Sequence, residues 1–323
     1  MKKNTQKKSS GKKVWGICSV LIAGVMVAAN ILVQGEFKSI LGTVLGGPMP
    51  ITDSSIEKLY KSDYDSKEES KEEGDKLNVK IAEEGFTLLL NEENALPIAT
   101  PESEANKASE KPRVSVFGKN SVNLVLGGSG SGGISGDSAA TIYDGLEAGG
   151  FEVNPTLKAF YENNNASGNG RGANPTLSEA STSAPTLPIG ETPFANYTGE
   201  VFGSFADYND AAIVVISRIG GESFDLPRFQ NMEEGGIEGN HYLQLNQNEY
   251  DMLDMVTSKF DKVIVVLNTL TSFQCDFIAE YNNTATNKRI DAVLWIGGPG
   301  TTGAKAVGDL LNGNVNPSGK TVD

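Results

Sequence analysis

The side chain best suited to chemistry is Glu222, which lies in the segment Ser217-Arg-Ile-Gly-Gly-Glu-Ser-Phe-Asp225. It follows a strongly apolar run and stands on a Gly-Gly turn, with Arg218 and Asp225 close in the sequence. A carboxyl group at the end of a buried strand can act as a general acid where burial or a neighbouring charge raises its pKa. The alternative is a surface glutamate paired with Arg218, and the local sequence alone favours that alternative.

Metal sites and histidine-dependent triads are poorly supported. His241 is the only histidine, and Cys18 and Cys275 are the only cysteines. The sequence therefore lacks the paired Cys and His spacing of a zinc site, and a Ser-His-Asp triad would have to be built around His241. We expect no metal and no other cofactor, and we expect a structural or surface role for His241.

A glycine-rich stretch, Leu126-Gly-Gly-Ser-Gly-Ser-Gly-Gly133, contains the pattern G-x-G-x-x-G from Gly128 to Gly133. In a dinucleotide-binding fold this pattern follows its strand immediately, whereas here it begins well after the nearest apolar run. No G-K-[ST] sequence directly follows this stretch, so it is not a P-loop. The stretch predicts a loop that lies against a polar ligand, or a plain flexible loop, in preference to a nucleotide site.

Four short runs are apolar almost throughout, which is typical of parallel strands covered on both faces. Helical periodicity separates them, and the clearest helix opens with a capping box formed by Asn246 and Glu249. This alternation predicts a three-layer αβα sandwich around a mostly parallel, doubly wound sheet. The predicted strands are Val114–Phe117, Ala211–Ile216, Val263–Leu267 and Ala292–Ile296. The predicted helices are 70–91, 139–148, 246–260 and 301–311.

Ligands of such sheets bind in the crevice beyond the carboxyl ends of the strands. That rule selects four loops, which begin at Gly118, Ser217, Asn268 and Gly297. Residues 163–198 are rich in Asn, Ser, Gly, Thr and Pro, and they predict a flexible insertion in the domain.

The N-terminus predicts export from the cytoplasm. Residues 1–13 form a basic tail, and the apolar run over 14–34 has about the 20 residues that a bilayer-spanning helix needs. The lysines should stay cytoplasmic, which places a stalk at 35–76 and a domain at 77–323 outside the cell membrane. A signal peptide cleaved near Val27-Ala28-Ala29 is the alternative, and it would give a secreted protein.

The overall charge argues against nucleic acid as a partner. The net charge is −14, and the six charged residues before residue 36 are all lysines, so the remainder carries −20. An acidic surface repels phosphate backbones, whereas a neutral ligand such as a sugar is unaffected.

Several segments, taken in order along residues 77–323, resemble the C-terminal αβα domain of glycoside hydrolase family 3. They are Ala82–Pro97, Val114–Asn120, Leu126–Gly133, Ser217–Asp225, Leu294–Gly300 and Gly313–Gly319. The resemblance implies part of a retaining β-glycosidase, of the β-glucosidase or β-xylosidase type, which acts on a β-linked oligosaccharide or glycoside.

In a retaining glycosidase two carboxyl groups flank the scissile bond, one as nucleophile and one as acid and then base. By resemblance Glu222 is the acid/base, which replaces the surface interpretation above. Resemblance also implies that Gly128, Ser129 and Gly130 line the sugar site. Arg218 would orient Glu222, contact the substrate or form a structural salt bridge, and Phe224 would pack on the sugar ring or anchor its loop. The family usually has glycine where Ser223 stands, which affects the expected loop geometry.

The nucleophile of the family is an aspartate on a separate (β/α)8 barrel. We therefore expect a barrel downstream, in a permuted domain order, and expect that residues 1–323 are a fragment that does not hydrolyse glycosides alone. The main alternative is a non-catalytic carbohydrate-binding or sensing domain outside the cell.

Overall fold

The computed structural model describes residues 10–34, 62–98, 111–136, 138–174, 187–222, 225–230, 233–283, 285 and 288–321. The chain divides into two compact units, Met1–Asp63 and Tyr64–Asp323. In the first unit, helix α1 (Ser10–Gln34) contains the stretch Lys13–Ile31, which is long and apolar enough to cross a membrane. A signal sequence meets the same criterion, so both predicted interpretations of this segment stand.

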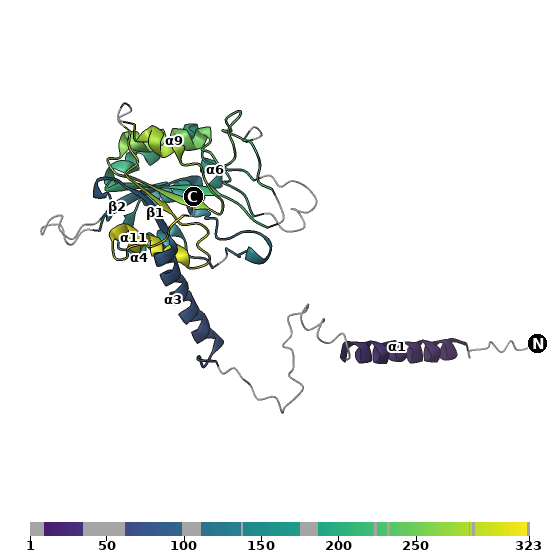
Figure 1. Ribbon diagram of the computed structural model, residues 1–323. Helices are drawn as coiled ribbons and strands as arrows, with labels where there is room; N and C mark the ends of the chain where they lie inside the picture. Colours follow the sequence, from purple (N-terminus) through teal and green to yellow (C-terminus); the bar gives the residue numbers. More distant parts are fainter. Residues whose placement is uncertain are drawn as a thin grey trace, which may run out of the picture. The chain divides into compact units, whose positions relative to one another are not determined.

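The second unit is built on a mostly parallel sheet (Figure 1). In the part of the chain that the structure describes, the sheet has six strands in the order β1-β6-β5-β4-β2-β3. β1 pairs antiparallel with β6, and the other pairs are parallel. All four predicted strands are present, and the predicted fold class is confirmed. The strands are β1 (Thr87–Asn91), β2 (Arg113–Phe117), β3 (Glu152–Val153), β4 (Ala211–Arg218), β5 (Val263–Thr269) and β6 (Ala292–Trp295).

Most helices of this unit, though not α10 and α11, begin at polar side chains that accept backbone hydrogen bonds. Thr141 and Asp144 form a capping box at α4, and the predicted box of Asn246 and Glu249 is present at α9. Asn154 caps α5. The helices are α3 (Lys67–Gly85), α4 (Ile142–Ala148), α5 (Pro155–Glu162), α6 (Asn164–Ser167), α8 (Gly199–Ser204), α9 (Gln247–Lys259), α10 (Asp276–Tyr281) and α11 (Ala306–Asn312).

Helices cover both faces of the sheet, with α9 on one side and α4 and α11 on the other (Figure 1). β4 is buried along its whole length and supplies both cores. Ile213 and Val215 belong to the core shared with α4 and α11, whereas Val214 and Ile216 belong to the core shared with α9. Burial on both faces explains why its sequence is continuously apolar.

The prediction of a helix over 70–91 is wrong at both ends. It begins at Lys67, inside the predicted stalk, and it ends at Gly85. Residues Thr87–Asn91 form β1, which pairs with the edge of β6. The run Leu88-Leu-Leu90 fits a helix face and a short strand equally well, so periodicity does not separate the two. The helix predicted over 301–311 has a 3₁₀ turn, Gly303–Lys305, ahead of α11.

The described parts of the predicted insertion, 163–174 and 187–198, are packed on the domain, and residues 175–186 lie outside the described residues. Asn120, in the loop after β2, accepts a hydrogen bond from Arg171 N and donates one to Ile189 O. Arg171, Ile189 and Tyr197 are buried. The polar composition that predicted flexibility therefore supplies side chains and backbone groups for internal hydrogen bonds.

Glu191, in the same segment, is a buried carboxyl group, 5% exposed. It accepts hydrogen bonds from Lys119 N at 3.0 Å and from Thr192 N at 2.8 Å. Burial raises the pKa of Glu191 to about 8, against the lowering effect of these two amides. The folded state therefore binds a proton that the unfolded state releases at a lower pH.

We predict that Glu191→Gln flattens the dependence of stability on pH. With a pKa near 4.5 unfolded and about 8 folded, the contribution of Glu191 is full at low pH and is lost as the pH rises toward 8. Urea unfolding at several pH values across this interval should show a falling free energy for the native protein and a smaller slope for the variant. An equal slope in both would contradict the assignment.

We also predict that Gly145→Ala destabilises the fold by about 1–3 kcal/mol, because overpacking forces helices apart. A β-carbon at Gly145 would overlap the carbonyl oxygen of Ala304, just ahead of α11. Gly203→Ala in α8 is the matched control, since a β-carbon there meets nothing within 4 Å. We expect that control to stabilise by up to about 1 kcal/mol, from helix propensity. Thermal unfolding followed by circular dichroism measures both, and equal midpoints would refute the close helix contact.

Candidate functional site

The loops at the carboxyl ends of the strands are joined by one buried side chain, Asn268. Its Oδ1 accepts hydrogen bonds from Val125 N at 2.7 Å and Ser217 Oγ at 3.1 Å. Its Nδ2 donates to Val125 O at 2.8 Å and Gly297 O at 2.7 Å. The loops that follow β2 and β6 are thereby joined to the carboxyl ends of β4 and β5 at one edge of the sheet, where the sequence predicted a site.

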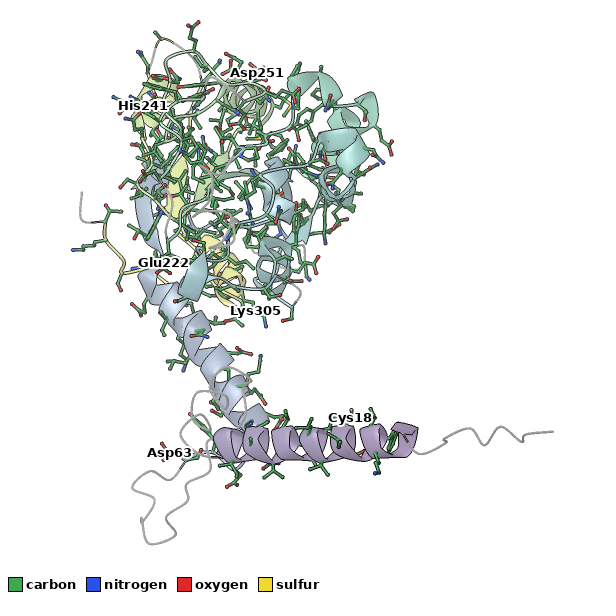
Figure 2. The ribbon with its side chains drawn as sticks, turned by 90° about the vertical axis from the view of Figure 1, so that its right-hand side faces the viewer. Cys18, Asp63, Glu222, His241, Asp251 and Lys305 are labelled. Carbon is green, nitrogen blue, oxygen red and sulfur yellow. The ribbon has the colours of Figure 1, made fainter. Side chains whose placement is uncertain are left out.

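Glu222 lies on the loop after β4, against the glycine-rich loop 126–133. Ser129 Oγ donates to the backbone oxygen of Glu222 at 2.8 Å, and Ser131 N makes a long hydrogen bond of 3.4 Å to Glu222 Oε2. The preceding Gly221 is required by this contact, because a β-carbon there would lie 2.5 Å from Ser129 Oγ. The Glu222 side chain is exposed (Figure 2).

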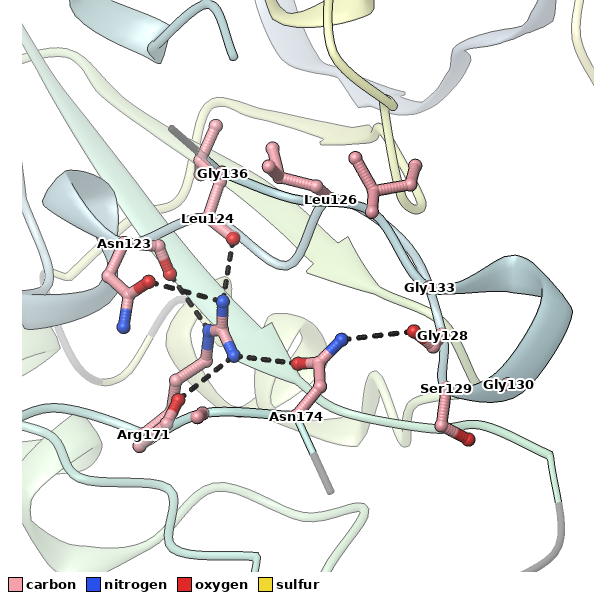
Figure 3. A pocket seen from close by; sticks show the side chains of 13 residues that line it. Asn123, Leu124, Leu126, Gly128, Ser129, Gly130, Gly133, Gly136, Arg171 and Asn174 are labelled. Atoms are coloured by element: carbon pink, nitrogen blue, oxygen red, sulfur yellow. Dashed lines mark hydrogen bonds between the residues drawn. The ribbon is translucent and has the colours of Figure 1, made fainter. Parts of the chain in front are cut away.

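The glycine-rich loop also forms one wall of an open cavity of about 760 Å³ (Figure 3). Gly128, Ser129 and Gly130, the residues expected in the sugar site, all line it. Leu124, Leu126 and Ile134 give it an apolar side, and Asn123, Arg171 and Asn174 a polar side. Such a mixture of apolar and hydrogen-bonding surface suits a neutral polar ligand.

Asn174 binds the glycine-rich loop from the opposite wall, and Arg171 binds the residues just before that loop (Figure 3). Asn174 Nδ2 donates to Gly127 O at 2.7 Å, and Arg171 Nη2 donates to Leu124 O at 2.7 Å. Burial lowers the pKa of Arg171 to about 10. Sequence reasoning missed both residues; the available signal was that Arg171 is the only basic residue in the polar segment 163–198.

Arg218 is not among the residues that line this cavity. Its side chain is fully buried and forms a two-pronged ion pair with Glu249, with both N–O distances 2.7 Å. Its remaining donors bind backbone oxygens of Ser217, Tyr242 and Gln244. Burial lowers the pKa of Arg218, but the Glu249 carboxylate outweighs burial and raises it above the usual value. The structural salt bridge predicted as an alternative is therefore formed, with Glu249 as partner.

The other candidate residues lie apart from this arrangement or beyond description. Phe224 and Ser223 fall outside the described residues. His241 is exposed, stacks on Phe229 with ring centroids 5.2 Å apart, and is well separated from Glu222 in Figure 2. Among the described residues, no group of three or more His, Cys, Asp or Glu side chains is arranged to hold a metal ion.

Comparison with known proteins places this arrangement in a family. Beta-glucosidase A of Butyrivibrio fibrisolvens is 28% identical over 263 residues, which are 76% of this chain and 28% of that protein. Beta-glucosidase 3B from Thermotoga neapolitana, solved in complex with glucose, superposes with a TM-score of 0.56 at 25% identity, over 77% of this chain and 30% of that one. A beta-glucosidase from Paenibacillus barengoltzii gives a TM-score of 0.55 at 30% identity, over 75% of this chain and 23% of that one.

The chain thus spans less than a third of each of these relatives. The profile of the glycosyl hydrolase family 3 C-terminal domain matches residues 86–322, well over half of the chain. That span begins at the end of α3 and includes the glycine-rich loop, Glu222 and Asn268. The chain therefore belongs to glycoside hydrolase family 3, through the C-terminal domain of that family.

Proposed function

We propose that this domain supplies the acid/base Glu222 and part of the sugar site of a retaining β-glycosidase of the β-glucosidase type. The observation that supports this most directly is the contact between the Glu222 segment and the glycine-rich loop, whose other residues line the cavity. A carboxyl group beside a cavity that accepts a neutral sugar is what proton donation to a glycosidic oxygen requires.

In the proposed reaction Glu222 acts twice. It first donates its proton to the glycosidic oxygen while a carboxylate nucleophile attacks the anomeric carbon, and the aglycone leaves as an alcohol. Glu222 then removes a proton from the water that releases the sugar from the nucleophile. The nucleophile is proposed to lie on a (β/α)8 barrel outside the described residues, since the relatives are more than three times as long as the matched region.

The exposure of Glu222 fits this division between domains. A barrel and a sugar bound over the loops would exclude water from the Glu222 carboxyl group. The domain alone therefore presents the acid/base, and the second domain completes its environment.

We place the domain outside the cell, either held by α1 as a membrane anchor or released after α1 is cleaved as a signal. The length and apolar character of α1 support both forms, and the lysines that precede it favour a cytoplasmic N-terminus. Oligosaccharides outside the cell would then be the accessible substrates.

A non-catalytic sugar-binding function is the second candidate, and the cavity of about 760 Å³ favours it, because the cavity needs no barrel to exist. Calorimetry of the chain with glucose, cellobiose and xylobiose distinguishes the two. Binding by this chain, together with a full-length protein that shows no hydrolysis, would support the sensor and refute the enzyme.

For the enzyme, we predict that Glu222→Gln in the full-length protein slows cellobiose hydrolysis by about 10²–10⁴-fold, the usual contribution of general acid catalysis. Hydrolysis of 2,4-dinitrophenyl β-glucoside should slow far less, since that leaving group needs no proton. Steady-state kinetics on both substrates give the ratio of the cellobiose rate to the dinitrophenyl glucoside rate. Asp225→Asn is the control, with the same charge change three residues away, and should leave the ratio unchanged. Equal losses on both substrates in Glu222→Gln would count against the assignment.

The contact between the loops gives a second prediction. Gly221→Ala should push Glu222 away from Ser129 and lower kcat/KM on cellobiose by roughly tenfold or more, since about 1 Å of misplacement is enough for such losses. Gly132→Ala is the matched control in the glycine-rich loop, because a β-carbon at Gly132 meets nothing within 4 Å. Similar rates for the two variants would show that the close approach does not matter.

A further inference from the structure

The loop that carries Glu222 leaves the sheet and returns to it at the same side chain. It leaves at Arg218, the last residue of β4, and it rejoins regular structure at Asn246, the N-cap of α9. Arg218 Nε donates to Tyr242 O at 2.7 Å, and Nη2 donates to Gln244 O at 2.6 Å. The guanidinium thus binds the outgoing and returning ends of the loop together.

Glu249 fixes the other side of this junction. Its carboxylate accepts hydrogen bonds from Arg218 Nη1 and Nη2, both at 2.7 Å. It also accepts a hydrogen bond from Asn246 N at 2.9 Å, as part of the capping box. The side chains of Arg218 and Glu249 are 0% and 2% exposed. The ion pair therefore joins the end of β4, the returning loop and the first turn of α9 in one geometry.

The path from this junction to Glu222 is short and held by further bonds. Only Ile219, Gly220 and Gly221 intervene. Arg218 O accepts Leu270 N at 3.3 Å, and Ile219 N donates to the Tyr242 hydroxyl at 3.3 Å. Ile219 is 1% exposed and packs in the same small core as Tyr242. Arg218 and Ile219 thus fix the start of the segment that leads to Glu222.

Stability alone is a poor reason for such a pair. Taking both charges out of water costs several kcal/mol per ion, and apolar residues of similar volume often stabilise a fold equally well. Apolar residues form no directional hydrogen bonds. The planar guanidinium holds its partners at defined angles, and lysine does not reproduce that geometry.

We infer that Arg218 and Glu249 form a positioning pair, which sets the place of the Glu222 carboxyl relative to the glycine-rich loop and thereby controls proton donation. This inference rests on the proposed role of Glu222. It assigns to Arg218 an effect on the chemical step although Arg218 touches no substrate.

The test uses the full-length protein that carries this domain and compares kcat on cellobiose with kcat on 2,4-dinitrophenyl β-glucoside. Arg218→Lys should lower the cellobiose value at least tenfold more than the dinitrophenyl value, with KM changed less than about twofold. The double variant Arg218→Met, Glu249→Leu removes both charges. Its ratio of cellobiose kcat to dinitrophenyl kcat should stay below the native ratio, even where its unfolding midpoint is close to that of the native protein.

Two further variants make every outcome decisive. Tyr242→Phe removes only the hydroxyl that accepts Ile219 N, so the fold is kept, and the ratio should fall about threefold. Arg289→Lys is the control: it alters an ion pair with Asp291, which precedes β6 at the opposite edge of the sheet, and should change stability but not the ratio.

The inference would be overturned if the ratio of the two kcat values stayed unchanged in Tyr242→Phe and in those Arg218 variants that fold. It would also be overturned if the double variant had both the native ratio and the native stability. If Glu222→Gln itself leaves the ratio unchanged, the proposed acid/base role fails instead. The positioning pair fails alone when Glu222→Gln behaves as predicted and the pair variants do not.

Discussion

The site depends on one requirement, that the polar groups at the carboxyl ends of four buried strands be satisfied without water. Asn268 meets it by accepting two hydrogen bonds and donating two, which join it to the loops after β2 and β6 and to Ser217 near the end of β4. A buried amide with all its partners in place is rigid, since any displacement would leave an unpaired polar group. The starting points of the glycine-rich loop and of the Glu222 loop are therefore held together, and the Ser129–Glu222 hydrogen bond joins the loops themselves.

The strands and the edge that carries the site were predictable because they follow from local rules. Buried parallel strands are continuously apolar, and ligands bind beyond their carboxyl ends, so the loop of Glu222 could be placed at that edge. The resemblance to family 3 was needed to expect Gly128–Gly130 and Glu222 in one sugar site. The role of Arg218 was not predictable to the same degree. Its partner Glu249 lies 31 residues away, and nothing in the segment around Arg218 distinguishes a partner on α9 from one on its own loop.

The insertion shows a different limit of structure prediction from sequence. Residues 163–174 and 187–198 have the composition of a flexible segment, but their buried contacts are made by a few residues such as Arg171 and Ile189. Whether polar residues order a segment depends on what they meet in the fold, here Asn120 and the carbonyl groups after β2. The composition of the segment does not reveal these partners in the fold. The helix prediction over β1 was wrong for the same reason, because β1 pairs with β6, which is remote in sequence.

The charges beneath the Glu222 loop also bear on how its chemistry would depend on pH. Burial raises the pKa of Glu191 to about 8 and that of Glu233 to about 7, while Glu249 is paired with Arg218. Glu233 accepts a hydrogen bond from Gly190 N, so it joins the packed insertion to the loop that follows Glu222. Burial therefore keeps Glu191 mostly protonated near neutral pH and Glu233 partly so, although Lys119 and Arg218 act in the opposite direction. As the pH rises Glu191 and Glu233 ionise within the network that holds the loop. A loss of activity on the alkaline side would therefore report these buried groups, and an apparent pKa from a rate profile would belong to the network as a whole.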